Sequence, residues 1–205
     1  MKLGLACDGC PPPAAVLDLL GAAGLPVAAA AAARSPAFVW AADDAWALAP
    51  GADLLTACLR GVLDAAIVGK DLLLERRPAV SELLDLRLSP DRIVYAVAPD
   101  GGRGEPSRPR VATPYPRCTR RYFAAAGRQV EPIAFGEASL APELGLADGV
   151  VDLESRIRAG APGLVVREEF AACSLRLVAG RAARTLSSGR LEDLLERLRA
   201  ALEEA

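Results

Sequence analysis

The stretch Ala65-Ala-Ile-Val-Gly-Lys-Asp71 is a short apolar run that ends in a glycine, a cation and an anion. Four apolar residues followed by glycine are typical of a buried strand that ends in a tight turn. In open α/β sheets, ligands bind at the carboxyl ends of the strands, so Gly69, Lys70 and Asp71 become candidate ligand-binding residues. The structural alternative is a polar turn in which Asp71 caps the next helix.

Similar apolar runs alternate with helical patterns along most of the chain. Strands are predicted over residues 2–7, 38–41, 65–68, 92–97, 110–112, 130–133, 149–153, 163–166 and 173–178. Helices are predicted over residues 12–23, 53–60, 71–75, 116–126, 140–144 and 191–202. Strands that alternate with helices favour an α/β fold with largely parallel sheets.

A passage rich in glycine, proline and arginine, residues 99–109, falls near the middle of the chain and predicts a crossing between two lobes. The first lobe is expected to comprise residues 1–97 and 178–205, and the second residues 98–177. The last helix carries leucines on one stripe, at positions 191, 194, 195, 198 and 202, and should pack on the first lobe.

The composition excludes several function classes. The chain has 205 residues, 52% of them hydrophobic, and a net charge of −2, which is typical of a globular protein rather than a nucleic-acid binder with a basic face. It contains no histidine, so it can form neither a Ser-His-Asp triad nor a histidine-ligated metal site. The longest apolar stretch, residues 25–33, is too short to span a membrane. Five cysteines without framework spacing indicate a reducing cytoplasm.

Three segments resemble one family. Residues 61–86 contain the Gly-Lys-Asp motif and Leu72-Leu-Leu-Glu75, residues 110–123 read Arg-Val-Ala-Thr-Pro-Tyr-Pro-Arg-Cys-Thr-Arg-Arg-Tyr-Phe, and residues 141–152 read Ala-Pro-Glu-Leu-Gly-Leu-Ala-Asp-Gly-Val-Val-Asp. In order and spacing they are similar to segments of the catalytic subunit of ATP phosphoribosyltransferase, in the short form that lacks a regulatory domain.

The resemblance implies a fold and an activity. The fold would be two α/β lobes like those of a type II periplasmic binding protein, with the ligand cleft between them. The activity would be transfer of a phosphoribosyl group from phosphoribosyl pyrophosphate to N1 of the adenine in ATP, with Mg²⁺, as the first step of histidine biosynthesis. The implied partners are a second copy, in a homodimer, and a separate regulatory subunit that resembles a histidyl-tRNA synthetase. The substrate-binding residues implied by the matched motifs are Asp53, Thr56, Gly69, Lys70, Asp71, Thr113, Tyr115, Arg120 and Asp152.

The chain departs from the family pattern where that pattern binds phosphate. The family loop reads Asp-x-x-x-Thr-Gly-x-Thr-Leu, whereas this chain reads Asp-Leu-Glu-Ser-Arg-Ile-Arg-Ala-Gly from Asp152 to Gly160. Ser155 could replace part of the lost loop, and Arg156 and Arg158 could bind phosphate through their side chains. The alternative is a decayed loop with solvated arginines.

Other departures remove cations that two polyphosphate ligands would need. The family's Pro-Lys-Gly-Arg becomes Cys7-Asp-Gly-Cys10, the arginine before Asp53 is missing, and Pro114 replaces a lysine. The second hypothesis is therefore a diverged paralogue or a pseudoenzyme that binds another small molecule, with chemistry that could involve Cys7 and Cys10.

The cysteines and tryptophans allow two interpretations each. Cys7 and Cys10 have Cys-x-x-Cys spacing, and with Cys118 they could form a thiol or metal site; the alternative is ordinary partly buried cysteines. Trp40 and Trp46 could stack on a planar ligand or pack in the core.

Overall fold

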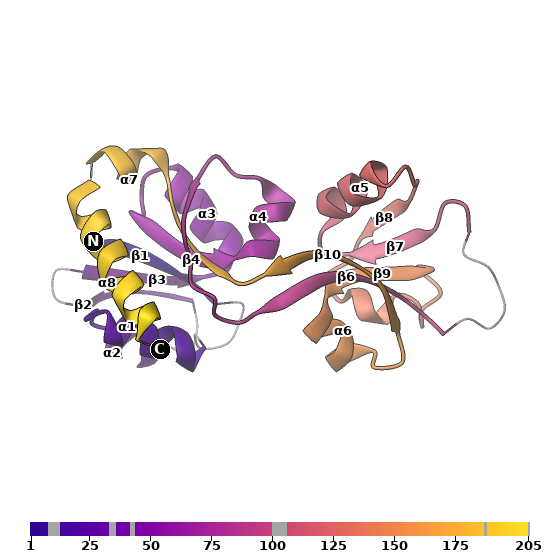
Figure 1. Cartoon of the computed structure of the whole chain (residues 1–205), viewed down its shortest axis with the longest axis horizontal. Helices are drawn as coiled ribbons and strands as arrows, with labels where there is room; N and C mark the ends of the chain where they lie inside the picture. The colour runs from indigo at the N-terminus through magenta and orange to yellow at the C-terminus, as the bar shows by residue number, and fades with distance from the viewer. Residues whose placement is uncertain (8–12, 33–35, 42–43, 100–105, 187, 205) are drawn as a thin grey trace. The chain divides into compact units, whose positions relative to one another are not determined.

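A computed structural model describes the chain except residues 8–12, 33–35, 42–43, 100–105, 187 and 205. The chain forms two compact units, each built on its own sheet (Figure 1). Unit 1 comprises Met1–Leu73, Arg77–Ser89 and Ser174–Ala205, and unit 2 comprises Leu74–Arg76 and Pro90–Cys173. The first division falls earlier than residue 97 because the strand over Asp91–Val97 pairs within the second sheet. The second falls earlier than residue 177 because the strand over Leu175–Ala179 pairs within the first sheet.

Unit 1 contains a six-stranded mixed sheet in the order β2-β3-β1-β4-β11-β5. Its strands are β1 (Lys2–Ala6), β2 (Ala37–Ala41), β3 (Asp44–Ala49), β4 (Ala65–Gly69), β5 (Ser81–Asp85) and β11 (Leu175–Ala179). Strands β3, β1 and β4 are parallel neighbours, so their carboxyl ends lie at one edge of the sheet. Strand β3 was not predicted, because three of its six residues are alanine, which is depleted in strands.

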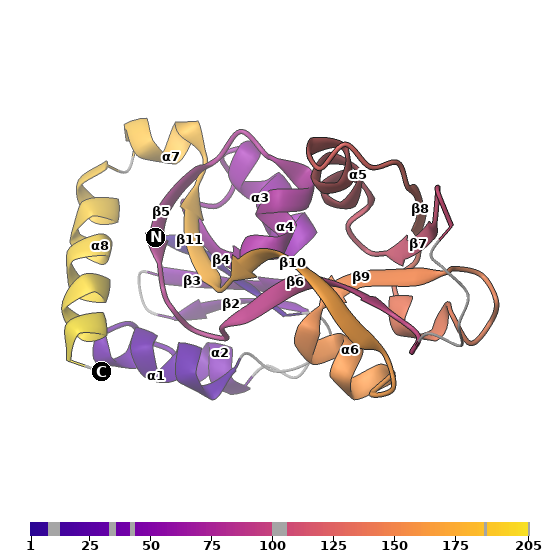
Figure 2. The ribbon, with the colours of Figure 1, turned by 45° about the vertical axis from the view of Figure 1, so that its right-hand side comes forward.

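Helices cover both faces of this sheet (Figures 1 and 2). They are α1 (Ala14–Ala22), α2 (Ala28–Ala32), α3 (Gly51–Leu59), α4 (Lys70–Arg76), α7 (Arg181–Leu186) and α8 (Ser188–Glu203). Helices α1, α2 and α8 pack in one core cluster with Leu5, Trp46 and Ile67, whereas α3 packs on the other face against Ala66 and Val68. The predicted leucine stripe of the last helix is confirmed, because Leu191, Leu194 and Leu198 are buried.

Unit 2 contains a five-stranded sheet in the order β10-β6-β9-β7-β8. Its strands are β6 (Asp91–Val97), β7 (Arg110–Thr113), β8 (Glu131–Ala134), β9 (Gly149–Leu153) and β10 (Val165–Cys173). Strands β8, β7 and β9 are parallel, and β6 and β10 run antiparallel to their neighbours. The carboxyl ends of β7 and β9 therefore meet at one edge.

Two layers of helix cover the second sheet. Helix α5 (Pro116–Ala125) places Phe123 against Tyr95 on one face, with ring centroids 5.2 Å apart. On the other face, α6 (Glu154–Gly160) and the short helix η1 (Ala138–Leu140) pack through Ile157 and Ala138. The predicted helix over residues 140–144 is wrong: only the 3₁₀ turn η1 forms there, and Pro142 follows two residues after its end.

Candidate functional site

The parallel strands of unit 1 bring two predicted motifs to the same edge of its sheet. Strand β3 leads through Pro50 into α3, and β4 leads directly into α4 at Lys70. At the second junction a Cβ on Gly69 would lie 2.1 Å from the Asp71 Oδ1 atom, so a larger residue there would require the Asp71 side chain to shift. The Asp71 carboxylate thus lies over the strand end, as a turn at a helix start would place it.

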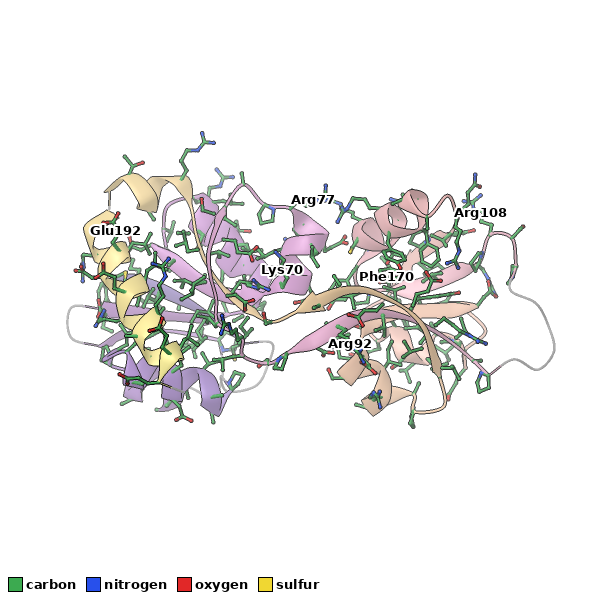
Figure 3. The ribbon with its side chains drawn as sticks, viewed as in Figure 1. Lys70, Arg77, Arg92, Arg108, Phe170 and Glu192 are labelled. Carbon is green, nitrogen blue, oxygen red and sulfur yellow. The ribbon has the colours of Figure 1, made fainter. Side chains whose placement is uncertain are left out.

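Lys70 projects from the start of α4, and its charge is already neutralised (Figure 3). Its Nζ lies 2.6 Å from Glu82 Oε2, and Glu82 also accepts an ion pair from Arg176 at 3.0 Å. Arg176 pairs in turn with Asp85 at 2.9 Å. A phosphate that binds Lys70 would therefore compete with Glu82.

The other predicted residues of unit 1 lie on α3. Asp53 is exposed in the first turn of α3, where a carboxylate is favoured by the helix dipole. Thr56 is exposed one turn later, and its Oγ1 donates a hydrogen bond to the Ala52 carbonyl at 3.0 Å. The Thr56 hydroxyl is therefore used within α3 itself, and Asp53 is the anionic side chain that α3 offers to a ligand at this edge of the sheet.

In unit 2, the carboxyl end of β7 forms a buried turn. The Tyr115 N–H donates to Thr113 Oγ1 at 2.9 Å, and the Thr119 hydroxyl donates to the same oxygen at 3.3 Å. Thr113 and Thr119 are fully buried and Tyr115 is 5% exposed. The two threonines therefore stabilise the turn into α5, and Tyr115 is the side chain of this set that reaches the neighbouring α6.

Asp152 and Arg156 lie beside this turn, at the end of β9. Asp152 is 3% exposed and accepts a hydrogen bond from the Leu153 N–H at 2.7 Å. The Arg156 guanidinium lies 3.7 Å from Asp152 Oδ1 and stays half exposed. Partial burial opposes ionisation of Arg156, but the charges of Asp152, Tyr115 and Glu137 and a hydrogen bond to Tyr115 outweigh it and raise its pKa. Tyr115, Asp152 and Arg156 therefore form one cluster from both strand ends.

The first turn of α6 is occupied by the protein's own carboxylates. Ser155 donates its N–H and its hydroxyl to Asp91, the first residue of β6. Glu154 accepts hydrogen bonds from Arg158 Nε at 2.9 Å and from Arg92 Nε at 2.8 Å. These bonds, that from Arg158 first, hold the pKa of Glu154 below its usual value of 4.5. Ser155 and Arg158, predicted as substitutes for the family's loop, are thus hydrogen-bonded to carboxylates. The Arg156 side chain is less exposed than that of Arg158, 52% against 73%, but its carboxylate partner Asp152 lies farther away, at 3.7 Å.

The start of α5 is also capped from within the chain. Glu75 accepts hydrogen bonds from the N–H groups of Arg117 at 3.1 Å and Cys118 at 2.8 Å. Arg120 is exposed on the same helix. Glu75, Asp91 and Glu154 were not predicted from the sequence as parts of the site; the only signal was that α5 and α6 begin without a capping side chain of their own.

The cysteines do not assemble a metal centre in the described part of the chain. Cys10 lies outside the described residues, Cys7 is buried at the end of β1, and Cys118 is half-buried in α5. No group of three or more histidine, cysteine, aspartate or glutamate side chains suited to a metal ion occurs among the described residues. Of the two tryptophans, Trp46 is buried and donates to the Pro26 carbonyl at 3.0 Å, whereas Trp40 is exposed.

Comparison with known proteins assigns the family. A family model described as ATP phosphoribosyltransferase matches residues 50–200, which include the carboxyl ends of β4, β7 and β9. The chain belongs to the ATP phosphoribosyltransferase family. It is 44% identical over 162 residues to ATP phosphoribosyltransferase of Symbiobacterium thermophilum, covering 74% of this chain and 72% of that protein. It is 41% identical over 157 residues to the enzyme named alike from Geobacillus kaustophilus, covering 76% and 75%. The predicted family resemblance is confirmed.

Solved structures agree on the fold of this ATP phosphoribosyltransferase family member. A chain of the HisG:HisZ ATP phosphoribosyl transferase complex from Thermotoga maritima superposes with a TM-score of 0.81 at 23% identity, covering all of both chains. The arginine-bound ArgBP of T. maritima, at 16% identity, has a TM-score of 0.57 and covers 100% of this chain and 94% of its own. The predicted likeness to periplasmic binding proteins is confirmed. None of the helices that the structure describes has the length and apolarity needed to cross a membrane.

Proposed function

We propose that this chain transfers the phosphoribosyl group of phosphoribosyl pyrophosphate to N1 of the adenine in ATP. The bond between the anomeric carbon and the pyrophosphate oxygen breaks, pyrophosphate leaves, and the adenine N1 forms the new bond to that carbon. Family membership supports this activity. The observation that assigns it to particular residues is the Tyr115–Asp152–Arg156 cluster, which lies at the neighbouring carboxyl ends of the parallel strands β7 and β9.

The chemistry suits a chain without histidine. Pyrophosphate is an adequate leaving group once its charge is neutralised, so the protein must mainly position two anionic substrates and stabilise the charge that develops. In this proposal the Arg156 guanidinium holds the phosphoribosyl 5′-phosphate, and buried Asp152 keeps that guanidinium in place. Lys70 binds an anionic group only when it exchanges its ion pair with Glu82.

Magnesium fits the proposal as a companion of the substrate. Mg²⁺ usually binds through one or two carboxylates together with substrate phosphates, rather than in an all-protein cage. The described residues offer no cluster of three ligand side chains, which favours an ion that arrives with the pyrophosphate group and neutralises it. The carboxylate that unit 1 offers to such an ion is Asp53, which is exposed at the start of α3.

A partner and a location accompany the activity. The similarity to a chain of the HisG:HisZ complex supports a separate regulatory subunit for this chain. The proposal also places the protein in the cytoplasm, where ATP and phosphoribosyl pyrophosphate are found.

Pyrophosphate release tests the activity. The purified chain, alone and with its candidate regulatory subunit, should release pyrophosphate only when ATP, phosphoribosyl pyrophosphate and Mg²⁺ are all present, with one equivalent of phosphoribosylated ATP formed. Asp152→Asn should lower the rate at least tenfold while the circular dichroism spectrum stays unchanged. Release that does not require ATP, or no release under any combination, would contradict the proposal.

One observation favours a second candidate, a diverged member that binds another small molecule. Asp91 and Glu154 place two carboxylates at the start of α6, where the family's loop receives a phosphate, and Asp91 accepts hydrogen bonds from Ser155. Calorimetric titration with phosphoribosyl pyrophosphate and Mg²⁺ separates the two candidates. Binding at micromolar ligand supports the transferase, and no heat at millimolar ligand supports the diverged binder.

A further inference from the structure

Lys70 belongs to a network of four charged side chains at the end of strand β4. Its Nζ lies 2.6 Å from one carboxylate oxygen of Glu82, and the other oxygen of Glu82 lies 3.0 Å from the Arg176 guanidinium. Arg176 also pairs with Asp85 at 2.9 Å, and Asp85 accepts a hydrogen bond from the Ser174 hydroxyl at 2.7 Å. Glu82 is thus shared between Lys70 and Arg176.

An irregularity in strand β5 brings both carboxylates to this network. Glu82 and Asp85 are three positions apart, and in a regular strand such residues face opposite sides of the sheet. Asp85 lies opposite Arg176 on β11. Glu82 lies opposite Val178, which is only two positions beyond Arg176. Leu83 is therefore an extra residue in β5, and it turns Glu82 to the face of the sheet that carries Asp85. Extra residues of this kind often re-aim a side chain beside a functional site.

Glu82 keeps a partner when Lys70 turns to a ligand. A partly buried carboxylate that loses all of its partners is strongly destabilising. Here Arg176 remains 3.0 Å from Glu82 and is itself anchored by Asp85, and its side chain is only 18% exposed. The Lys70 side chain is 26% exposed, so its ammonium group is accessible from solvent. The network therefore permits the exchange of Glu82 for an incoming anion without isolating the Glu82 charge.

We propose that Glu82 determines which anions Lys70 accepts, as a built-in competitor that polyphosphates displace and singly charged anions do not. This inference rests on the proposed function, because it takes Lys70 as a contact for the charged groups of a substrate. Glu82 does not touch the substrate and acts through Lys70.

The selectivity follows from charge and tethering. A tethered group competes at an effective concentration in the millimolar range, so a free carboxylate or chloride gains nothing by replacing Glu82 and loses its freedom of movement. A phosphate group carries a charge of about −1.5 to −2 and three acceptor oxygens, so it attracts Lys70 more strongly than one carboxylate does. Lys70 is thereby reserved for phosphate-rich ligands.

Titration of the intact chain with inorganic pyrophosphate tests the proposal. Glu82→Gln keeps the shape of the side chain and removes its charge, so it should bind pyrophosphate at least about fivefold more tightly than wild type. The combined variant Lys70→Ala with Glu82→Gln should lose this gain. Asp18→Asn removes one negative charge from an exposed position of α1 and controls for net charge, so its Kd should change less than about twofold.

Three results would overturn the proposal. The first is binding by Glu82→Gln that is unchanged or weaker than that of wild type. The second is a gain in affinity that persists when Lys70 is also replaced. The third is an absence of pyrophosphate binding to both wild type and Glu82→Gln at millimolar ligand.

Acetate provides a second readout that a purely structural role of Glu82 would not move. A free carboxylate can take the place of the missing one, so acetate at about 100 mM should weaken pyrophosphate binding by Glu82→Gln relative to chloride at the same ionic strength. Wild type should respond equally to both salts, because Glu82 already occupies Lys70. A variant that does not distinguish acetate from chloride would refute the competition.

These measurements need neither ATP nor turnover, so they separate this inference from the proposed function. A chain that forms phosphoribosylated ATP but whose Glu82→Gln variant gains no affinity would refute the role of Glu82 and leave the activity intact. A chain without transferase activity whose Glu82→Gln variant gains affinity through Lys70 would refute the activity and leave the role of Glu82 intact.

Discussion

The substitution Arg156→Ala tests whether a side chain has replaced the family's phosphate loop. The Arg156 guanidinium is the exposed cation of the cluster at the ends of β7 and β9, 3.7 Å from Asp152. We expect the variant to bind phosphoribosyl pyrophosphate more weakly than wild type while its fold is preserved, because a half-exposed arginine supports little core packing.

The expected size follows from the exposure of the side chain. A charge-assisted hydrogen bond contributes ~1.5–3 kcal/mol. The Arg156 side chain is 52% exposed, and solvent screening places its contribution at the lower end of that range, about 1.5 kcal/mol. That value corresponds to roughly a tenfold rise in Kd.

Isothermal titration with phosphoribosyl pyrophosphate and Mg²⁺ measures the change, and Arg158→Ala is the matched control. Arg158 lies two residues away on the same helix, but its guanidinium is bonded to Glu154. Its removal should change Kd less than twofold. Should Arg158→Ala weaken binding as much as Arg156→Ala, or Arg156→Ala have no effect, the assignment of the phosphate to Arg156 would be refuted.

Three further outcomes test the description of the two units. Burial, and to a smaller extent the charge of Asp64, raises the pKa of Cys58 to about 12. Cys58 should therefore resist iodoacetamide at pH 8 in the native protein and react once the protein is unfolded, which mass spectrometry of the digested protein measures. Gly180→Ala should lower the free energy of unfolding in urea by about 1–3 kcal/mol, because its Cβ would lie 2.0 Å from the Cys58 carbonyl oxygen. Gly163→Ala, with open space around it, should change that free energy by less than about 0.5 kcal/mol. The folded-state pKa of Glu154 is depressed below 4.5, so the stability that its ionised carboxylate contributes is present above pH 4.5 and is lost as pH falls through the folded-state pKa. The free energies of unfolding of wild type and Glu154→Gln should therefore converge at low pH in acid unfolding experiments. A difference between the two that stays constant with pH would contradict this expectation.

Much of the fold could be predicted because its strands are strongly apolar. The strands that became β1, β4, β6, β7 and β9 all carry runs of buried aliphatic residues, and the Gly-Lys-Asp motif fixed where β4 ends. Strand β3 and helix α2 escaped prediction because both are rich in alanine, which has little preference for a strand and carries no amphipathic pattern in a five-residue helix. The boundary between the two units, predicted at residue 97, lies before β6, because β6 pairs with β9 and β10 and local sequence does not encode such long-range pairing.

The candidate site was predictable as a set of positions but not as a set of partners. Lys70, Arg156 and Arg158 could be identified as cations from the sequence, but the pairing of Lys70 with Glu82 could not, and the pairing of Arg158 with Glu154 was missed. The Lys70–Glu82 pair could not be predicted because the two residues are distant in sequence and come together only because β4 and β5 both pair with β11. The pair on α6 is an i,i+4 contact, which the spacing of Glu154 and Arg158 does encode and which helical periodicity would have found had α6 been predicted.

A crystal structure of the intact chain with phosphoribosyl pyrophosphate and Mg²⁺ tests the central claim most directly. The account predicts the 5′-phosphate within hydrogen-bonding distance of the Arg156 guanidinium, with Ser155 still bonded to Asp91. A ligand bound elsewhere, or a phosphate that displaces Asp91 and sits on the backbone of α6 without touching Arg156, would contradict it.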